Sequence, residues 1–115
     1  MTQDCIFCKI AAGEIPAKLV YQDEHVIAFH DIDPKAPVHV LIIPRRHIES
    51  LAALDSDDAE TVGRLLLVAD QIAQATSVAA SGYRVTFNVG RDAGMAVYHL
   101  HAHLMGGRRL GWPPG

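Results

Sequence analysis

Hydrophobic residues between positions 62 and 76 recur at intervals of three and four, the spacing of one buried helix face. This pattern predicts a long helix whose first turn is rich in acidic residues, where the helix dipole favours negative charge. These residues are Asp55, Asp57, Asp58 and Glu60. We expect Gly82 to end the helix. The buried face should comprise Val62, Leu65, Leu66, Ala69, Ile72, Ala73 and Thr76.

The remaining apolar patterns are shorter and predict one short helix and several strands. Residues 5–12 favour a short helix that Gly13 ends. Pro44 closes a β-branched, apolar run typical of a central buried strand. The predicted strands are residues 17–21, 25–30, 38–43, 83–88 and 97–105, the last two forming a hairpin around a loop at 90–94. Together they predict an α+β fold, a single domain over residues 1–115 with an antiparallel sheet.

Composition removes several function classes. Half of the 115 residues are hydrophobic and the net charge is −3, so we expect no basic face for nucleic acid. No stretch approaches the roughly 20 apolar residues needed to cross a bilayer, and the first four residues lack the features of a signal peptide. Two cysteines three positions apart do not make a secreted disulfide scaffold. We expect a cytoplasmic protein that binds no membrane.

Three histidines, His99, His101 and His103, alternate with Leu100 and Ala102. On a strand, residues two apart share one face about 7 Å from each other, so three imidazoles should line one side of the sheet. The other side should face the core with Tyr98, Leu100, Ala102 and Leu104. Imidazole supplies both a neutral nucleophile and a cationic partner near neutral pH. The pattern favours nucleophilic phosphate chemistry. Metal binding is the main alternative, and an inert strand is the other.

The segment from His99 to Met105 resembles the signature of the histidine triad (HIT) superfamily. The match extends to Phe29–Ile32 with Pro34, Ala36, Pro37 and His39, to Ile42–His47, and to the closing Trp112–Gly115, which are similar to the Hint-like branch. The resemblance implies a HIT-like fold with a sheet of about five strands, one short and one long helix, and a sheet extended by homodimerisation. It covers nearly the whole chain.

The resemblance also implies roles for residues at matching positions. His101 would attack the α-phosphorus of a nucleotide and form a nucleotidyl-histidine intermediate that water hydrolyses. His103 would hold a phosphate oxygen and help to protonate the leaving group, and His39 would orient both from behind. Asn88 and the backbone N–H groups of Gly94 and Ala96 would bind the phosphate.

The nucleoside would occupy the other end of the site. Asp31 would accept hydrogen bonds from both ribose hydroxyls, since a carboxylate has two acceptor oxygens. Phe7, Ile10, Ile32 and Ile6 would form the slot for the base. Where family members usually carry glutamine and then serine or threonine, this chain has Met95 and Ala96. This departure puts the preferred leaving group in doubt, because two polar side chains near it are replaced by apolar ones.

Cys5 and Cys8 lie on one face of the predicted short helix. From the residues alone they are either buried thiols or half of a metal site. Some bacterial HIT proteins bind zinc through such a pair, and the resemblance then adds His47 and His99 as ligands of a structural Zn²⁺. It implies no catalytic metal.

Trp112 stands in a proline- and glycine-rich tail that offers little for it to pack against locally. In Hint-like proteins this tail reaches the partner subunit of a homodimer and borders its active site. A frayed terminus is the alternative.

The expected function is hydrolysis of purine nucleoside 5′-phosphoramidates, including aminoacyl-adenylate-type compounds, to the nucleoside monophosphate. One alternative is a dinucleoside polyphosphate hydrolase of the same superfamily. The other is a nucleotide- or zinc-binding interaction protein with little activity.

Overall fold

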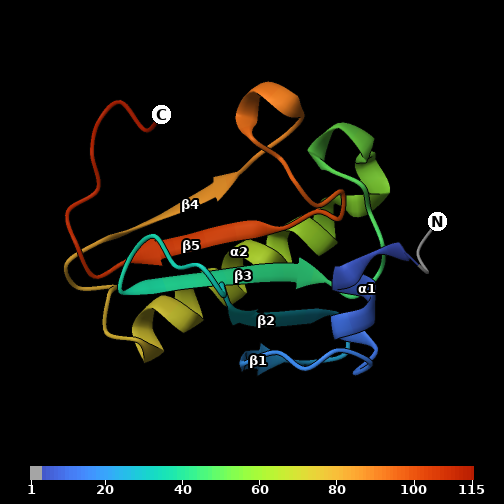
Figure 1. Ribbon diagram of the computed structural model, residues 1–115, viewed down its shortest axis with the longest axis horizontal. Helices are drawn as coiled ribbons and strands as arrows, with labels where there is room; N and C mark the ends of the chain where they lie inside the picture. Colours follow the sequence, from blue (N-terminus) through green and yellow to red (C-terminus); the bar gives the residue numbers. More distant parts are fainter. Residues whose placement is uncertain (1–3) are drawn as a thin grey trace.

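The computed structural model describes residues 4–115 and contains one antiparallel sheet of five strands (Figure 1). The expectation of no signal peptide concerns residues 1–3 in part, which lie outside the described residues. The order across the sheet is β1-β2-β3-β5-β4. The strands are β1 (Leu19–Gln22), β2 (Val26–His30), β3 (Val38–Pro44), β4 (Tyr83–Phe87) and β5 (Ala102–Gly106). The predicted α+β class and the central, buried position of β3 are confirmed.

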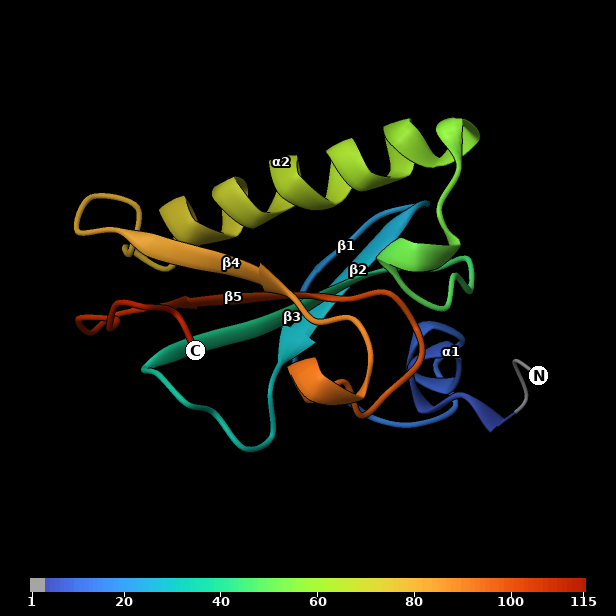
Figure 2. The same cartoon turned by 90° about the horizontal axis from the view of Figure 1, so that it is seen from above.

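The two faces of the sheet carry different structures (Figure 2). Helix α2 (Ala59–Ala75) lies along one face and packs on apolar side chains such as Val40, Ile42 and Leu104. Helix α1 (Ile6–Ala11) and the loop that connects β2 to β3 lie on the opposite face. There a smaller apolar cluster forms around Phe7, Phe29 and Leu41. Because side chains alternate along a strand, each strand contributes side chains to the large α2-side core and, from the alternate positions, to the opposite face.

Helix α2 confirms the predicted long helix but differs from it at both ends. It ends at Ala75, not Gly82, because Ser77 adopts the left-handed conformation (φ 64°) and the Thr76 hydroxyl donates a hydrogen bond back to the Ile72 carbonyl oxygen (2.7 Å). Glu60 is the acidic residue of the first turn, whereas Asp55 caps a preceding 3₁₀ turn at Ser56–Asp58.

One position of the predicted helix face is also wrong. Leu66 is exposed, and Val68 is buried in the core instead. Leu65 and Ala69 were placed correctly. In a run of three leucines, the spacing alone does not say which of two neighbouring residues faces the sheet, and the tertiary contact decides it.

Strand β5 is shorter than the predicted strand 97–105. It begins at Ala102, so His99 and His101 precede it and only His103 lies within it. The register pairs Ile42 with Ala102, which would place Pro44 opposite Leu100. Proline has no N–H for the next ladder bond, and the Leu100 N–H donates to the Ile48 carbonyl oxygen instead (2.6 Å). The alternation nevertheless persists, because Leu100, Ala102 and Leu104 are buried in the α2-side core. Tyr98, predicted for the same side, is 52% exposed because the strand has not yet begun there.

Among residues 4–115, no helix combines the length and the apolar composition that crossing a bilayer requires.

Candidate functional site

Four imidazoles form a continuous row on the sheet face opposite α2. His39 on β3 contacts His103 on β5, with ring centroids 5.3 Å apart. His103 in turn lies 5.0 Å from His101, measured between ring centroids. His99 continues the row toward α1 and contacts His47, again at 5.0 Å. The backbone register brings His39 into this row, since β3 and β5 are hydrogen-bonded neighbours.

Backbone groups fix which nitrogen of His101 carries the proton. Its Nδ1 lies 2.7 Å from the carbonyl oxygen of His99. A carbonyl oxygen only accepts hydrogen bonds, so Nδ1–H must be the donor, and Nε2 of the neutral ring keeps its lone pair. The Phe7 ring packs edge-on against the imidazole, with centroids 5.1 Å apart. His101 is therefore held in the tautomer and the orientation of a nitrogen nucleophile.

A similar argument fixes His39 and His103. The backbone N–H of Lys35 donates to His39 Nδ1 (3.0 Å), so the neutral His39 ring carries its proton on Nε2. His39 Nε2 lies 3.0 Å from His103 Nδ1 and 3.4 Å from a carboxylate oxygen of Asp31. Since His103 Nδ1 then accepts, its own proton resides on Nε2. His103 thus presents an N–H donor, whereas His101 presents a lone pair.

Burial keeps these rings neutral. It lowers the pKa of His39 and of His101, while the nearby Asp31 carboxylate partly opposes both shifts. The pKa of His103 falls to about 4, because burial is reinforced by the neighbouring imidazoles of His101 and His39. At neutral pH a nucleophilic lone pair and an N–H donor are therefore both available without a prior proton transfer.

The low pKa of His103 makes stability depend on pH in a defined direction. Its folded-state pKa of about 4 lies below the unfolded value of 6.5, so folding favours the neutral ring. This stabilisation is fully present above pH 6.5 and is lost as the pH falls from 6.5 to about 4. Its upper bound is about 3 kcal/mol, and solvent screening at the half-buried ring makes the loss smaller. Urea unfolding at pH 7 and pH 4 should show this loss, and a His103→Asn variant should lose less. A ring-proton NMR titration of His103 with a midpoint near 6.5 would contradict the assignment.

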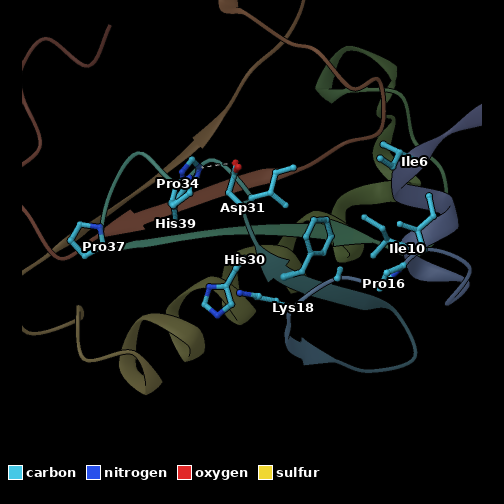
Figure 3. Close-up of a pocket in the computed structure, with 13 residues that line it drawn as sticks. Ile6, Ile10, Pro16, Lys18, His30, Asp31, Pro34, Pro37 and His39 are labelled. Atoms are coloured by element: carbon cyan, nitrogen blue, oxygen red, sulfur yellow. Dashed lines mark ion pairs between the residues drawn. The ribbon is translucent and has the colours of Figure 1, made fainter.

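A first cavity of about 880 Å³ lies between α1 and the loop after β2 (Figure 3). Figure 3 shows Ile10 and Ile6 on the α1 side and Asp31 with His39 at the other end. Ile32, which is 99% exposed, also lines the cavity. The cavity therefore joins an apolar slot to a carboxylate beside the histidine row.

The structure brings together Asp31, Ile32, Ile10 and Ile6 at this cavity but places Phe7 elsewhere. Phe7 is 6% exposed and packs behind His101. Phe29, which the sequence analysis did not select for the slot, lines the cavity instead. The alternation along β2 could have indicated Phe29, because it lies two residues before Asp31.

A second cavity of about 740 Å³ adjoins the first at Asp31 and His39. It is lined by His103 and by the expected phosphate-binding residues Asn88, Gly94 and Ala96. The C-terminal tail also lines this cavity, through Pro113 and Pro114 among others. Trp112 does not line it and is 83% exposed. The Arg84 guanidinium lies 6.0 Å from the centroid of the Trp112 ring. The two cavities therefore meet at one end of the histidine row, where Asp31 and His39 line both.

A separate cluster is formed by Cys5, Cys8, His47 and His99, whose ligand atoms all lie within 4.8 Å of one another. Cys5 Sγ is 3.3 Å from His99 Nδ1, and Cys8 Sγ is 3.4 Å from His47 Nδ1 and 3.5 Å from His99 Nδ1. Bonds of about 2.3 Å to sulfur and 2.0–2.1 Å to nitrogen at tetrahedral angles separate S and N by about 3.5 Å. The four side chains are close enough to bind a metal ion in that geometry.

The hydrogen bond of the other His99 ring nitrogen also suits a metal ligand. Its Nε2 lies 2.8 Å from the Pro44 carbonyl oxygen, so Nε2 carries the proton and the Nδ1 lone pair faces the thiols. Burial and the Cys5 thiol raise the pKa of Cys8 to about 11, which disfavours a reactive thiolate there. The geometry fits a metal-ligand set better than a redox pair.

Asp31, His39 and His103 form a second group with metal-like spacing. Here the tautomer argues against ligation. The Lys35 N–H donates to His39 Nδ1, so His39 Nε2 carries a proton and has no lone pair for a cation. These three residues are better suited to hydrogen bonding than to holding an ion.

Comparisons with known proteins agree with this geometry. The HIT domain family model matches residues 12–110, a range that begins after the two cysteines. The chain is 45% identical over 111 residues to the purine nucleoside phosphoramidase of Escherichia coli K12, covering 96% of this chain and 93% of that protein. It is 47% identical to an uncharacterised HIT-like protein of Synechococcus elongatus, over the full length of both.

Solved structures show the same relationship. A HIT family hydrolase from Legionella pneumophila superposes with a TM-score of 0.95 at 50% identity, covering 96% of this chain and 99% of that one. A histidine triad protein from Clostridium difficile superposes with a TM-score of 0.91 at 42% identity, covering 94% of each. The expected five-stranded HIT-like fold is confirmed, and the chain belongs to the HIT domain family.

Proposed function

We propose that this protein hydrolyses purine nucleoside 5′-phosphoramidates, of the AMP-amine or aminoacyl-adenylate type, to the nucleoside monophosphate. The observation that carries the proposal is the hydrogen bond between His101 Nδ1 and the His99 carbonyl oxygen, which leaves Nε2 with its lone pair. The buried His101 ring packs 5.0 Å from His103, which lines the second cavity. The name of the 45% identical relative, purine nucleoside phosphoramidase, supports the same substrate class.

The reaction follows from the tautomers. His101 Nε2 attacks the α-phosphorus, forms a P–N bond to the enzyme and breaks the P–N bond to the amine. The His99 carbonyl oxygen stabilises the positive charge that develops on the ring. His103 Nε2–H, backed by His39, assists the departing amine. Water then cleaves the nucleotidyl-histidine, and the proton released in this step replaces the one that the amine carried away.

Substrate binding would divide between the two cavities. The base fits the apolar slot of Ile10, Ile32 and Phe29, and the ribose hydroxyls face Asp31. Asn88 and the backbone around Gly94 would bind the phosphate in the second cavity. Met95 is buried and Ala96 lines this cavity, so few polar side chains of that loop meet the leaving group. This loop therefore offers little to stabilise the extra charge of a polyphosphate leaving group, whereas Lys35, Arg84 and Arg108 line other parts of the cavity.

A comparison of two substrates tests the proposal. We expect adenosine 5′-phosphoramidate to release AMP with a kcat/KM at least about 100-fold above that of diadenosine polyphosphates, a difference of about 2.7 kcal/mol. Chromatographic measurement of AMP release gives both rates. Faster polyphosphate cleavage would assign the protein to the dinucleoside polyphosphate hydrolases, and no turnover of either would favour a binding protein.

We further propose Zn²⁺ as the structural ion of the Cys5, Cys8, His47 and His99 cluster, since two thiols and two imidazoles are a typical closed zinc set. Bound there, the ion would hold α1 against the segment before β5. Two free thiols also fit a reducing, cytoplasmic compartment.

A homodimer is proposed on two features. Strand β4 stands at one edge of the sheet, and edge strands carry unpaired backbone groups that a second copy can satisfy. The exposed Trp112 ring near Arg84 on that strand adds apolar surface.

A further inference from the structure

His99 contacts both the proposed zinc cluster and the proposed nucleophile, His101. Its side chain belongs to the cluster through Nδ1, which lies 3.3 Å from Cys5 Sγ and 3.5 Å from Cys8 Sγ. Its main-chain carbonyl oxygen, 2.7 Å from His101 Nδ1, fixes the tautomer of the nucleophile. His99 is completely buried, and its second ring nitrogen is tied to Pro44. Any change in the position of the His99 ring must therefore be passed to its backbone or absorbed by strain.

The two cysteines are also connected to His101 through Phe7 on α1. They flank Phe7 on α1, and the Phe7 ring packs edge-on against both His101 (5.1 Å) and His99 (6.0 Å). Cys5 also caps the helix, since its sulfur accepts a hydrogen bond from the Cys8 N–H (3.3 Å). The cluster thus joins the helix behind the nucleophile to the carbonyl group that orients it.

A third cavity separates the cluster from the phosphate side of the site. It measures about 340 Å³ and is lined by Cys5 and His47 together with Ala96, Val97 and Tyr98. Ala96 also lines the second cavity, so one short segment forms a wall between the cluster and the proposed phosphate site.

We propose that the Cys5, Cys8, His47 and His99 cluster is a positioning device for catalysis: a cation held there fixes the His99 backbone, and through it the Nδ1–H tautomer and the orientation of His101. His99 is then a positioning residue, because it acts on the reaction only through His101. The inference rests on the proposed hydrolytic function and adds metal dependence to it. Outer-sphere partners of this kind typically change activity by about 10- to 100-fold when they are lost.

The test compares the zinc-loaded protein, the same protein stripped with a chelator, and the stripped protein after Zn²⁺ is added back. Circular dichroism confirms that the stripped protein remains folded. We expect kcat for adenosine 5′-phosphoramidate to fall by about 10- to 100-fold on stripping and to recover with Zn²⁺. In ¹⁵N NMR spectra, His101 should change from a single Nδ1–H tautomer to a mixture, and return.

Two variants sharpen the result. Cys5→Ser with Cys8→Ser should reproduce the stripped state and should not respond to added Zn²⁺. Glu49→Gln, which alters the third cavity without removing a ligand, should keep both the zinc-loaded rate and the single tautomer. An unchanged kcat and an unchanged His101 tautomer after zinc removal would overturn the inference while leaving the hydrolysis intact. If the zinc-loaded protein fails to hydrolyse the substrate, the proposed function falls, and the tautomer measurement still decides whether the cluster positions His101.

Discussion

Replacing His101 with alanine should abolish AMP release from adenosine 5′-phosphoramidate, lowering kcat by about 10⁴-fold or more, because the variant lacks the atom that forms the covalent intermediate. No neighbouring ring can take its place. His103 Nδ1 accepts from His39, and the His99 ring faces the cysteines, so neither offers a free lone pair to the phosphorus. Single-turnover assays with quantification of AMP measure the loss.

The matched control is His25→Ala. His25 is an exposed histidine in the turn between β1 and β2, and it lines none of the three cavities described above. Its carbonyl oxygen accepts a hydrogen bond from the Arg45 N–H, which an alanine would keep. It should keep the wild-type rate, which separates the chemistry of His101 from a general effect of losing an imidazole. Mass spectrometry of acid-quenched wild type should reveal a nucleotidyl adduct that His101→Ala lacks. A variant at position 101 that retains the wild-type rate would remove the proposed nucleophile.

Replacing both cysteines should lower the free energy of unfolding, which is the second-largest effect that we expect. We expect about one zinc per chain in wild type purified without chelator, and none in a Cys5→Ser, Cys8→Ser variant. A ligand that binds only the folded state stabilises it by about 4 kcal/mol when its free concentration is 1,000 times Kd. The free energy of unfolding should fall by about that amount, measured by urea titration at matched free zinc.

Serine is the suitable replacement because the Cys5 sulfur caps α1, and a serine hydroxyl can accept the same N–H bond. The loss then reports the metal rather than the helix cap. Wild type stripped of zinc should match the variant to within about 1 kcal/mol, because both lack the ion and each serine keeps a small hydrogen-bonding side chain at a half-buried position. Metal-free wild type, or equal stability with and without zinc, would argue that the four residues are packed as ordinary core groups.

The sequence was most informative where local rules decide the structure. Alternation placed Leu100, Ala102 and Leu104 in the core, and Pro44 marked the end of β3. The start of β5 could not be predicted, because it depends on Pro44 lying opposite Leu100, a pairing between residues far apart in the chain. The end of α2 at Ala75, just before the left-handed Ser77, was missed for a different reason. A left-handed serine carries no sequence signal comparable to that of glycine.

The candidate site shows the same division. The row of His99, His101 and His103 was visible in the spacing, but its tautomers depend on the Lys35 N–H and on two backbone carbonyl groups. Phe7 reads as a residue of the base slot when only apolar character is considered. Its position behind His101 follows from the packing of α1 on the sheet, which no local pattern encodes.

Helix α2 lies on one side of the sheet, and every proposed reactive group lies on the other. This separation has a practical consequence for engineering. Residues such as Leu65, Val68 and Ile72 can be redesigned for heat tolerance with little risk to turnover, because the strands' own backbone lies between them and the imidazoles. Laboratory evolution of this scaffold toward new amine substrates could therefore vary the loops on the opposite side, while a reinforced helix layer absorbs the destabilisation that such changes usually bring.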